Sequence, residues 1–179
     1  MSEVYLKKAK KTPETGTSET RKIVERMLSE IEIGKETIAK KYASDLDGFN
    51  GDIIVSQESI ENASKMVPEK LKDDIKFAHE RIKKFAEAQK QSISEFETEL
   101  SPGLWAGQKL IPIQTAGCYV PGGRYAHVAS AIMSITTARV AGVENIIACS
   151  APKGEDGPNP AILYTCLLYT SPSPRDNTT

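Results

Sequence analysis

The feature that most constrains this chain lies between residues 116 and 150, where two short apolar runs flank a glycine turn and a helical stretch. Strand, turn, helix and strand in this order form a βαβ unit, in which the two strands run parallel and the crossover is right-handed. The helical stretch is rich in alanine, which lets it lie close on a sheet. We therefore predict an α/β protein. The segments are a strand at 116–120, the turn Pro121-Gly122-Gly123, a helix at 126–141 closed by Gly142, and a strand at 145–150.

Charged residues are concentrated in the N-terminal part of the chain. Residues 1–100 hold 38 of the 47 charged residues, which predicts solvated helices around a modest core. Apolar residues at helical spacing, together with capping residues, predict four helices there. The apolar run 53–55 is a candidate short strand. The predicted helices run from Ser18 to Gly34, from Ile38 to Asp47-Gly48, briefly after the cap Ser56, and from Pro68 to about Gln91.

The last of these helices carries an apolar seam in which residues recur at steps of four and three. Such a seam packs on another helix. It spans fewer than three heptads, so packing within the chain is favoured over a seam between two copies. His79 lies off the seam and is expected to be exposed. The seam consists of Leu71, Ile75, Ala78, Ile82 and Phe85.

Residues 93–115 are expected to be extended. Their apolar residues are separated by Ser101-Pro102-Gly103 and by Gly107, the turn chemistry of a hairpin. Pro112 indicates an edge strand, because proline cannot donate a hydrogen bond to a neighbouring strand. After the βαβ unit, residues 153–160 form a predicted polar turn, and Ala161 begins another predicted helix.

From Cys166 onward the pattern changes. Two Ser-Pro steps at 171–174 are incompatible with a helix or the interior of a sheet, and the run resembles translated adaptor sequence joined to a truncated protein. We predict that 166–179 is a foreign or disordered tail that neither continues the preceding helix nor starts a strand. The predicted organisation is an N-terminal helical region with short strands at 1–100, packed on an incomplete Rossmann-like parallel βαβ unit at 101–165.

Composition excludes several classes of protein. The net charge is −1, so no excess of basic residues points to nucleic acid or anionic lipid. No apolar run has the length of a membrane span, and the start of the chain does not read as a secretory signal. Three cysteines and two histidines form no zinc-binding spacing. We expect a cytoplasmic protein with neither a nucleic acid nor a membrane as its partner.

The turn at 119–123 is the candidate ligand site. Unpaired N–H groups at a helix N-terminus, and glycines without a Cβ, favour a bound phosphate. Tyr119 offers a flat ring and a hydroxyl suited to lying beside a nicotinamide ribose, or alternatively it is a core aromatic. The turn is neither GxGxxG nor a Walker loop. The residues alone therefore leave a structural turn and a ligand loop equally open.

A longer motif runs through the whole unit. Residues 117–123 read Gly-x-Tyr-x-Pro-Gly-Gly, followed by a Ser-containing helix with a Met, then Ala-x-x-Ala-Gly and a strand ending Cys-Ser-x-Pro. With this motif, the stretch 108–152 resembles the histidinol dehydrogenase family, and the resemblance extends more loosely over 1–165. Members of that family are homodimers that use NAD and zinc to oxidise a primary alcohol through an aldehyde to a carboxylate. The resemblance thus implies an alcohol substrate and both cofactors for the full-length protein.

The resemblance assigns few residues of this chain. The family's NAD-contacting tyrosine falls on Tyr119, in the loop with Gly122 and Gly123, and these three are the predicted cofactor-binding residues. The zinc ligands, the other NAD contacts and a Glu-His acid–base pair are expected beyond Thr165. No catalytic or metal-binding residue is therefore assigned here, and the chain itself is expected to be inactive. Whether it dimerises is left open, because dimers of the family exchange elements late in the chain.

The residues after the turn indicate one branch of the family. Arg124-Tyr125-Ala126-His127 stands where biosynthetic members carry small residues and a Pro-Ser pair. Together with Cys118, this variant resembles the sulfopropanediol 3-dehydrogenase branch, which oxidises 2,3-dihydroxypropane-1-sulfonate to sulfolactate. Histidinol is the second candidate substrate. Arg124 is either an anion ligand or a solvated charge, and His127 is read as a helix residue without a chemical role.

Two other interpretations stay open. A non-enzymatic helical interaction module would explain the seam at 71–85 and the lack of a catalytic constellation. A complete small NAD-binding protein is weaker, because one βαβ unit supplies only part of a dinucleotide site. We accordingly expect NAD binding by this chain to be weak.

Overall fold

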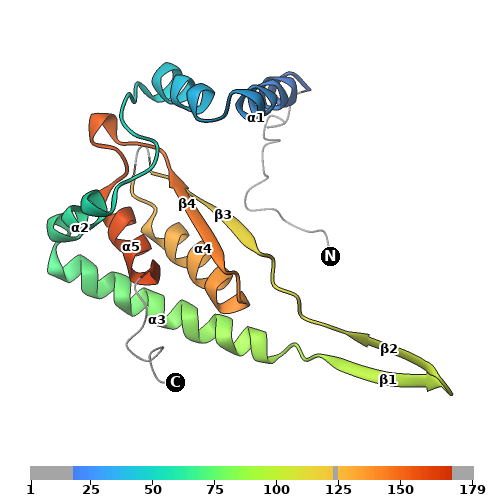
Figure 1. Ribbon diagram of the computed structural model, residues 1–179. Helices are drawn as coiled ribbons and strands as arrows, with labels where there is room; N and C mark the ends of the chain where they lie inside the picture. Colours follow the sequence, from blue (N-terminus) through green and yellow to red (C-terminus); the bar gives the residue numbers. More distant parts are fainter. Residues whose placement is uncertain (1–17, 123–124, 171–179) are drawn as a thin grey trace, which may run out of the picture.

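The computed structural model describes residues 18–122 and 125–170. Helices and strands alternate in the second half of this range, whereas the first half is helical (Figure 1). The elements are α1 (Ser18–Asp47), α2 (Gln57–Met66), α3 (Glu69–Gln91), β1 (Phe96–Ser101), β2 (Leu104–Gln108), β3 (Thr115–Val120), α4 (Val128–Ala141), β4 (Asn145–Ser150), a 3₁₀ turn (Gly154–Asp156) and α5 (Pro160–Thr170).

The βαβ unit forms as predicted. Strands β3 and β4 pair in parallel, from Thr115 opposite Asn145 to Val120 opposite Ser150, with α4 connecting them. Helix α4 ends at Gly142, whose φ of 95° is left-handed and therefore favours glycine. The α/β prediction is confirmed, and the parallel ladder contains these two strands in the described part of the chain.

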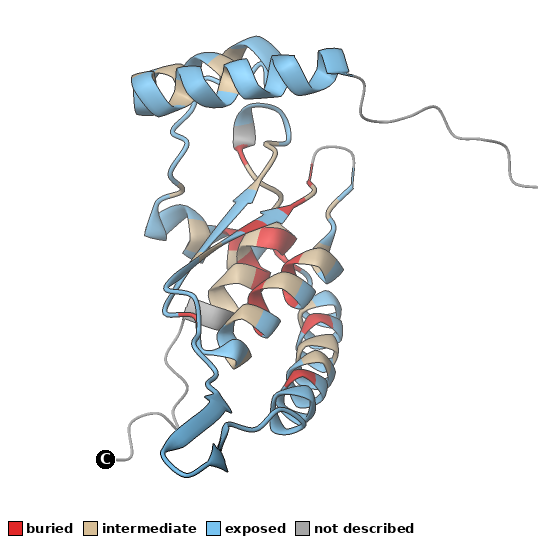
Figure 2. Ribbon diagram, turned by 90° about the vertical axis from the view of Figure 1, so that its right-hand side faces the viewer, coloured by how far each residue is buried: buried red, intermediate tan, exposed pale blue. Residues whose placement is uncertain are grey.

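The core lies where α3, α4 and α5 meet on one face of this small sheet (Figure 2). Buried residues of both halves of the chain share it, because Val67 and Ile75 pack with Ile132 and Tyr164. A second cluster joins the sheet to the two later helices, so α4 is in contact with both clusters. The second cluster consists of Cys118, Val120, Ala131, Ile135 and Ile162.

Helix α3 uses its seam within the chain, as predicted. Ile75 is buried in the core, and Ala78 and Ile82 pack against the same cluster. Phe85, the last residue of the predicted seam, is instead 64% exposed because the helix runs past the core. His79 is half-buried, so the prediction that it is exposed is wrong; its neighbour Ala78 packs against the core cluster.

Helix α1 lies apart from the other helices (Figure 1). It consists of the two predicted helices, which meet at a break at Lys35, where φ is 49° and ψ is −134°. None of its residues is buried. The predicted cap at Ser56 is confirmed for the next helix, since the Ser56 hydroxyl accepts a hydrogen bond of 3.1 Å from the Ser59 N–H.

The predicted hairpin forms and projects from the body as an arm (Figure 1). Strands β1 and β2 pair antiparallel, with Phe96 opposite Gln108 and Glu99 opposite Trp105. Every residue of both strands is exposed. The boundary drawn from the sequence at residue 100 falls inside this hairpin.

Two strand predictions are wrong. Residues 53–55 form no strand, since no neighbouring strand pairs with them, and Ile54 is 77% exposed. Pro112 lies in the irregular connection between β2 and β3 and not in an edge strand. Apolar runs thus indicate where the backbone is extended. They do not indicate whether a neighbouring strand is present to form hydrogen bonds with it.

The end of α5 also differs from expectation. The helix continues to Thr170 and does not end at the predicted boundary at Thr165. Residues 166–168 are half-buried, and Cys166 and Leu168 pack against the two core clusters, which explains why the helix is retained there. The Ser-Pro steps at 171–174 lie outside the described residues.

Candidate functional site

The carboxyl ends of the two parallel strands define one edge of the sheet. Strand β3 ends at Val120 and β4 at Ser150, and these two residues are paired in the ladder. In open α/β sheets, ligands bind outside this edge. The turn that leaves β3 is closed by a hydrogen bond of 3.2 Å from the His127 N–H to the Pro121 carbonyl. The predicted turn therefore lies where a ligand site is expected.

Tyr119 is exposed on the face of the sheet that α4 does not cover. Its exposed fraction is 65%, whereas its neighbours Cys118 and Val120 are buried against α4. The alternative reading of Tyr119 as a core aromatic is therefore wrong. Its cross-strand partner Cys149 is also exposed, and a Cβ added at Gly117 would meet no atom within 4 Å. The described residues thus leave most of Tyr119 uncovered on this face of the sheet.

Gly122 is buried and has a packing role. A Cβ at this position would overlap the Ser150 hydroxyl oxygen and lie 3.1 Å from the Ala151 carbonyl and 3.2 Å from Ile162 Cδ1. Glycine lets the turn lie directly against the end of β4 and against α5. The structure supplies a structural reason for this glycine, while its predicted cofactor contact stays a prediction. Gly123 and Arg124 lie outside the described residues.

Helix α4 begins at Val128, shortly after this turn. His127 is the N-cap residue, and its carbonyl accepts hydrogen bonds from the N–H groups of Ser130 (2.9 Å) and Ala131 (3.3 Å). The imidazole is exposed and makes no capping hydrogen bond. This placement agrees with the reading of His127 as a helix residue.

The three cysteines have different surroundings. Cys118 is buried, Cys149 is exposed, and Cys166 lies between these extremes. Burial, with a smaller contribution from Cys118, raises the pKa of the Cys166 thiol to about 11, so this thiol is protonated at neutral pH. Cys149 is accordingly the accessible thiol of the three, and it lies next to Tyr119 in the ladder.

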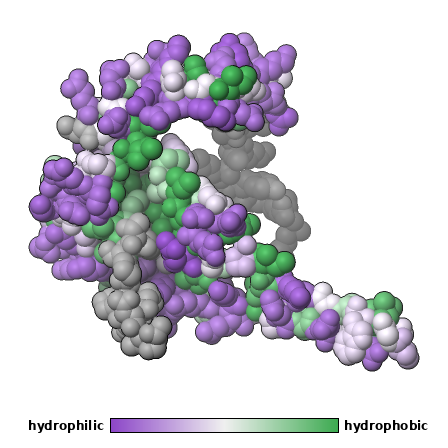
Figure 3. Space-filling model, in the orientation of Figure 1, coloured by the Kyte–Doolittle hydropathy of each residue, from purple (hydrophilic) through white to green (hydrophobic). Residues whose placement is uncertain are grey.

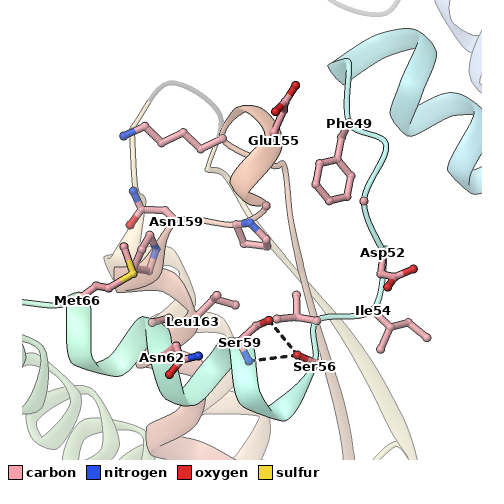
Figure 4. A pocket seen from close by; sticks show the side chains of 17 residues that line it. Phe49, Asp52, Ile54, Ser56, Ser59, Asn62, Met66, Glu155, Asn159 and Leu163 are labelled. Carbon is pink, nitrogen blue, oxygen red and sulfur yellow. Dashed lines mark hydrogen bonds between the residues drawn. The ribbon is translucent and has the colours of Figure 1, made fainter.

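A cavity of about 770 Å³ opens beyond the end of β4 (Figure 4). Its walls come from the link between α1 and α2, from α2, and from the loop between β4 and α5. Two wall side chains serve as helix caps: the Ser56 hydroxyl for α2, and Asn159, whose Oδ1 accepts 2.9 Å from the Ala161 N–H. The volume suits a small organic molecule. Other wall residues are Phe49, Asn62, Met66, Lys153 and Glu155.

Sequence reasoning missed this cavity. Its two walls are about one hundred residues apart in the chain, and neither carries a recognisable motif. The sequence predicts residues 153–160 only as a polar turn and residues 53–55 only as a short strand. Packing of α2 on α5 brings the walls together, and no local pattern could reveal that contact.

Zinc does not fit the residues seen here. Within residues 18–122 and 125–170, no three His, Cys, Asp or Glu side chains are grouped so as to hold a metal ion. A catalytic zinc site needs three protein ligands. No zinc chemistry can be derived from this part of the chain.

Among the described residues, no helix combines the length and the apolar character needed to cross a membrane.

Comparison with known proteins identifies the family. Residues 10–170 match the histidinol dehydrogenase family. The chain is 54% identical over 169 residues to a histidinol dehydrogenase homolog of Pelagibacter ubique, covering 94% of this chain and 40% of that protein. It is 50% identical over 164 residues to the sulfopropanediol 3-dehydrogenase of Ruegeria pomeroyi, covering 92% of this chain and 38% of that protein.

A solved structure agrees with the sequence matches. The crystal structure of histidinol dehydrogenase from Elizabethkingia anophelis superposes with a TM-score of 0.80 at 30% identity, over 88% of this chain and 36% of that one. The chain therefore spans about 40% of the length of the relatives it matches. Both the sequence motif and the fold lead to the same conclusion: this chain belongs to the histidinol dehydrogenase family.

Proposed function

We propose that this chain is the N-terminal part of an NAD-dependent dehydrogenase that oxidises a primary alcohol through an aldehyde to a carboxylate. Membership of the histidinol dehydrogenase family supports the reaction class. One structural observation carries the cofactor assignment: Tyr119 is exposed at the carboxyl end of β3, next to the turn that leads into α4. This is the edge at which open α/β sheets bind nucleotides.

The chain's own part in the reaction is to hold the cofactor. Tyr119 would lie flat beside the nicotinamide ribose, with its hydroxyl available for a hydrogen bond. Gly122 keeps the turn close to β4, so that the main chain of this turn can face a phosphate. Bound NAD supplies the hydride acceptor for both oxidation steps.

The groups that perform proton transfer are proposed to lie outside this chain. The described residues hold no cluster of metal ligands, and the sequence offers no Glu-His pair to which a family role transfers. The zinc ion, the acid–base pair and the homodimer are therefore proposed for the complete protein. A reducing, cytoplasmic location is part of the proposal and is supported by three free cysteines.

For the substrate, we propose 2,3-dihydroxypropane-1-sulfonate, with histidinol as the second candidate. The chain is 50% identical to a relative named sulfopropanediol 3-dehydrogenase and 30% identical to the histidinol dehydrogenase from Elizabethkingia anophelis. Both candidate substrates are small alcohols. We propose neither a nucleic acid nor a membrane as a partner.

The decisive experiment uses the complete protein of which this sequence is part. NADH formation is followed by absorbance with each of the two alcohols in the presence of zinc. We expect turnover with the sulfonate diol and little with histidinol. The reverse preference would correct the substrate, and the absence of NADH with both alcohols would overturn the proposal.

Tyr119→Ala tests the cofactor site, with Tyr125→Ala as a matched control. Tyr125 is 71% exposed in the same connection but lies beyond the turn, just before α4. We expect Tyr119→Ala to raise the KM for NAD by about tenfold, which corresponds to the loss of one aromatic contact, and Tyr125→Ala to leave it unchanged. An equal effect of both substitutions would remove Tyr119 from the site.

The chain alone should produce no NADH and should bind NAD weakly. Calorimetry of NAD against residues 1–179 tests this, and a low-micromolar affinity would favour a complete small NAD-binding protein. The non-enzymatic helical module loses its support, because much of the seam that suggested it is used inside the chain.

A further inference from the structure

Ser150 ends β4 and carries a hydroxyl that has no part in the function proposed above. Residues paired across a parallel ladder point to the same face of the sheet. Ser150 is paired with Val120, which is buried against α4, whereas Tyr119 is exposed on the opposite face. The Ser150 hydroxyl therefore lies at the carboxyl edge of the sheet, on the side that α4 covers.

The Ser150 hydroxyl lies against the main chain of the turn. A Cβ added at Gly122 would overlap Ser150 Oγ, and it would be 3.1 Å from the Ala151 carbonyl oxygen and 3.2 Å from Ile162 Cδ1. The hydroxyl is thus the group that most limits the space at Gly122. A glycine at this position leaves room for the hydroxyl.

The surroundings of this hydroxyl are formed by residues of the described chain. Apolar side chains of the β1–β2 arm, among them Phe96 and Trp105, are by contrast uncovered in the described part of the chain (Figure 3). The chain spans about 40% of the length of its relatives, and the part that it lacks is long enough to cover such surfaces. The contact between Ser150 and Gly122 is internal, so it does not depend on what covers the arm.

The hydrogen bond that Ser150 makes within the chain is weak. Its hydroxyl donates to the Ala151 carbonyl at 3.5 Å, whereas a good O–H···O hydrogen bond measures about 2.7–2.8 Å. Ser134 is half-buried like Ser150, and its hydroxyl donates to the Ser130 carbonyl at 2.7 Å. A half-buried hydroxyl with so long a hydrogen bond retains the capacity to donate to a better acceptor.

The position of Ser150 favours an acceptor that belongs to a dinucleotide. In open α/β sheets, the diphosphate lies over the turn that leaves the first strand, and the adenosine ribose lies toward the end of the next strand. Strands β3 and β4 take these two places, and Ser150 connects the end of β4 to the turn at Gly122. A phosphate oxygen is a strong acceptor because it is ionised.

We propose that the Ser150 hydroxyl donates a hydrogen bond to the phosphate on the adenosine side of bound NAD. This inference rests on the proposed function, because it requires NAD at the carboxyl edge of β3 and β4. Ser150 is then a cofactor-binding residue on the adenosine side of the turn, and Tyr119 lies on the nicotinamide side. A side chain at position 122 would displace the donor, which gives Gly122 a role toward the cofactor as well as in packing.

Steady-state kinetics of the complete protein, with the alcohol that it oxidises, test this role. Ser150→Ala should raise the KM for NAD by about tenfold and leave kcat unchanged, because it removes one hydrogen bond to a charged acceptor. Ser134→Ala is the matched control: its hydroxyl is also half-buried but bonds within α4, so both constants should stay unchanged. An unchanged KM in Ser150→Ala would overturn the inference and leave the proposed function standing. The absence of NADH with the unmodified protein would overturn both.

The two halves of the cofactor locate the hydrogen bond. AMP carries the phosphate of the adenosine side, nicotinamide mononucleotide carries the other phosphate, and each is measured as a competitor of NAD. Ser150→Ala should raise the inhibition constant of AMP by about tenfold and leave that of nicotinamide mononucleotide unchanged. Equal increases for both halves, or an increase for nicotinamide mononucleotide alone, would overturn the assignment.

A double variant separates this role from packing. Gly122→Ala places a Cβ where Ser150 Oγ lies, and Ser150→Ala removes that oxygen. The double variant should therefore recover most of the thermal midpoint that Gly122→Ala loses, while its KM for NAD stays about tenfold above that of the unmodified protein. A KM that recovers together with the midpoint would show that Ser150 acts only through packing, and would overturn the inference.

Discussion

Helices α1 and α3 are predicted by the same kind of pattern, yet only α3 has a core to pack on. Both carry apolar residues at steps of three and four. In α3 this face holds Ile75, which is 2% exposed, whereas in α1 the corresponding Leu28 is 61% exposed. Apolar periodicity therefore predicts a helix and the direction of its apolar face. Whether that face is covered depends on residues far away in the chain, which for α3 are those of α4 and α5.

Helix α1 makes side-chain contacts within itself and one ion pair of 3.5 Å, from Lys40 to Asp52 in the segment that follows it. Lys41 and Asp45 form an ion pair of 2.6 Å, and the Tyr42 hydroxyl donates 2.5 Å to Glu30 across the break at Lys35. These side chains are exposed, and solvent screens such contacts, so each contributes little to stability. A helix of this kind is stabilised weakly compared with one that is packed on a core.

The largest expected effect comes from paired substitutions in the two helices. Ile75→Ala should lower the free energy of unfolding by about 2–5 kcal/mol, because it leaves a cavity between α3, α4 and α5. Leu28→Ala should change it by less than about 0.5 kcal/mol. Urea denaturation followed by circular dichroism measures both. Comparable losses would show that α1 is covered by another part of the chain.

Substitution of a glycine in the βαβ unit should change the stability of the chain less than Ile75→Ala does. Gly122→Ala forces a Cβ into the Ser150 hydroxyl and should destabilise the chain by about 1–3 kcal/mol. Gly117→Ala adds its Cβ on the open face and should be neutral or stabilise by about 0.5 kcal/mol. The thermal midpoints of the two variants give the comparison. If Gly117→Ala were the more harmful, the open face of the sheet would have to be occupied.

Loss of the cap of α2 should destabilise the chain less than Gly122→Ala, but more than the pH effect at His79. Ser56→Ala removes the hydroxyl that accepts from the Ser59 N–H and should destabilise by about 1 kcal/mol, since α2 leads directly into the buried Val67. Ser29→Ala, inside the isolated α1, should be neutral, because alanine favours a helix. Equal midpoints for Ser56→Ala and the unmodified chain would show that α2 does not depend on this cap.

The smallest predicted effect is a dependence on pH at His79. Burial, followed by the charge of Lys83, lowers the pKa of this imidazole below 6.5. The unfolded chain then binds a proton more readily than the folded chain, so stability decreases as the pH falls through 6.5 and levels off below the folded pKa. Thermal midpoints of the unmodified chain and His79→Gln should converge at pH 8 and differ in slope below pH 6.5. Parallel profiles would contradict this.

Local residue types account for most of the fold. The cap at Ser56, the stop at Gly142 and the hairpin turn at 101–103 each act through their own backbone geometry, so they are readable from sequence. The strand expected at 53–55 fails because a strand requires a partner, and none of the described residues pairs there. Helix α5 extends beyond its predicted end for the opposite reason. Packing of Cys166 and Leu168 against the core stabilises a helical turn that no local signal in the sequence favours.

The candidate site was predictable in position but not in detail. The order strand, turn, helix places Tyr119 at the carboxyl edge, and the structure shows that its ring is exposed. The packing role of Gly122 depends on Ser150 and Ile162, whose distance from the turn only the folded chain defines. The cavity beside the β4–α5 loop was missed for the same reason, because its walls meet through α2 and α5.

The parallel pairing of β3 with β4 has a consequence for synthesis. Because the whole of α4 lies between them, β3 leaves the ribosome without a partner and waits until β4 has followed. The hairpin can form before that moment because its pairing is local, whereas α3 still lacks α5, one of the helices that cover its buried face. The nascent chain must therefore keep the apolar strand β3 from pairing with a wrong partner while the crossover helix α4 is still being synthesised.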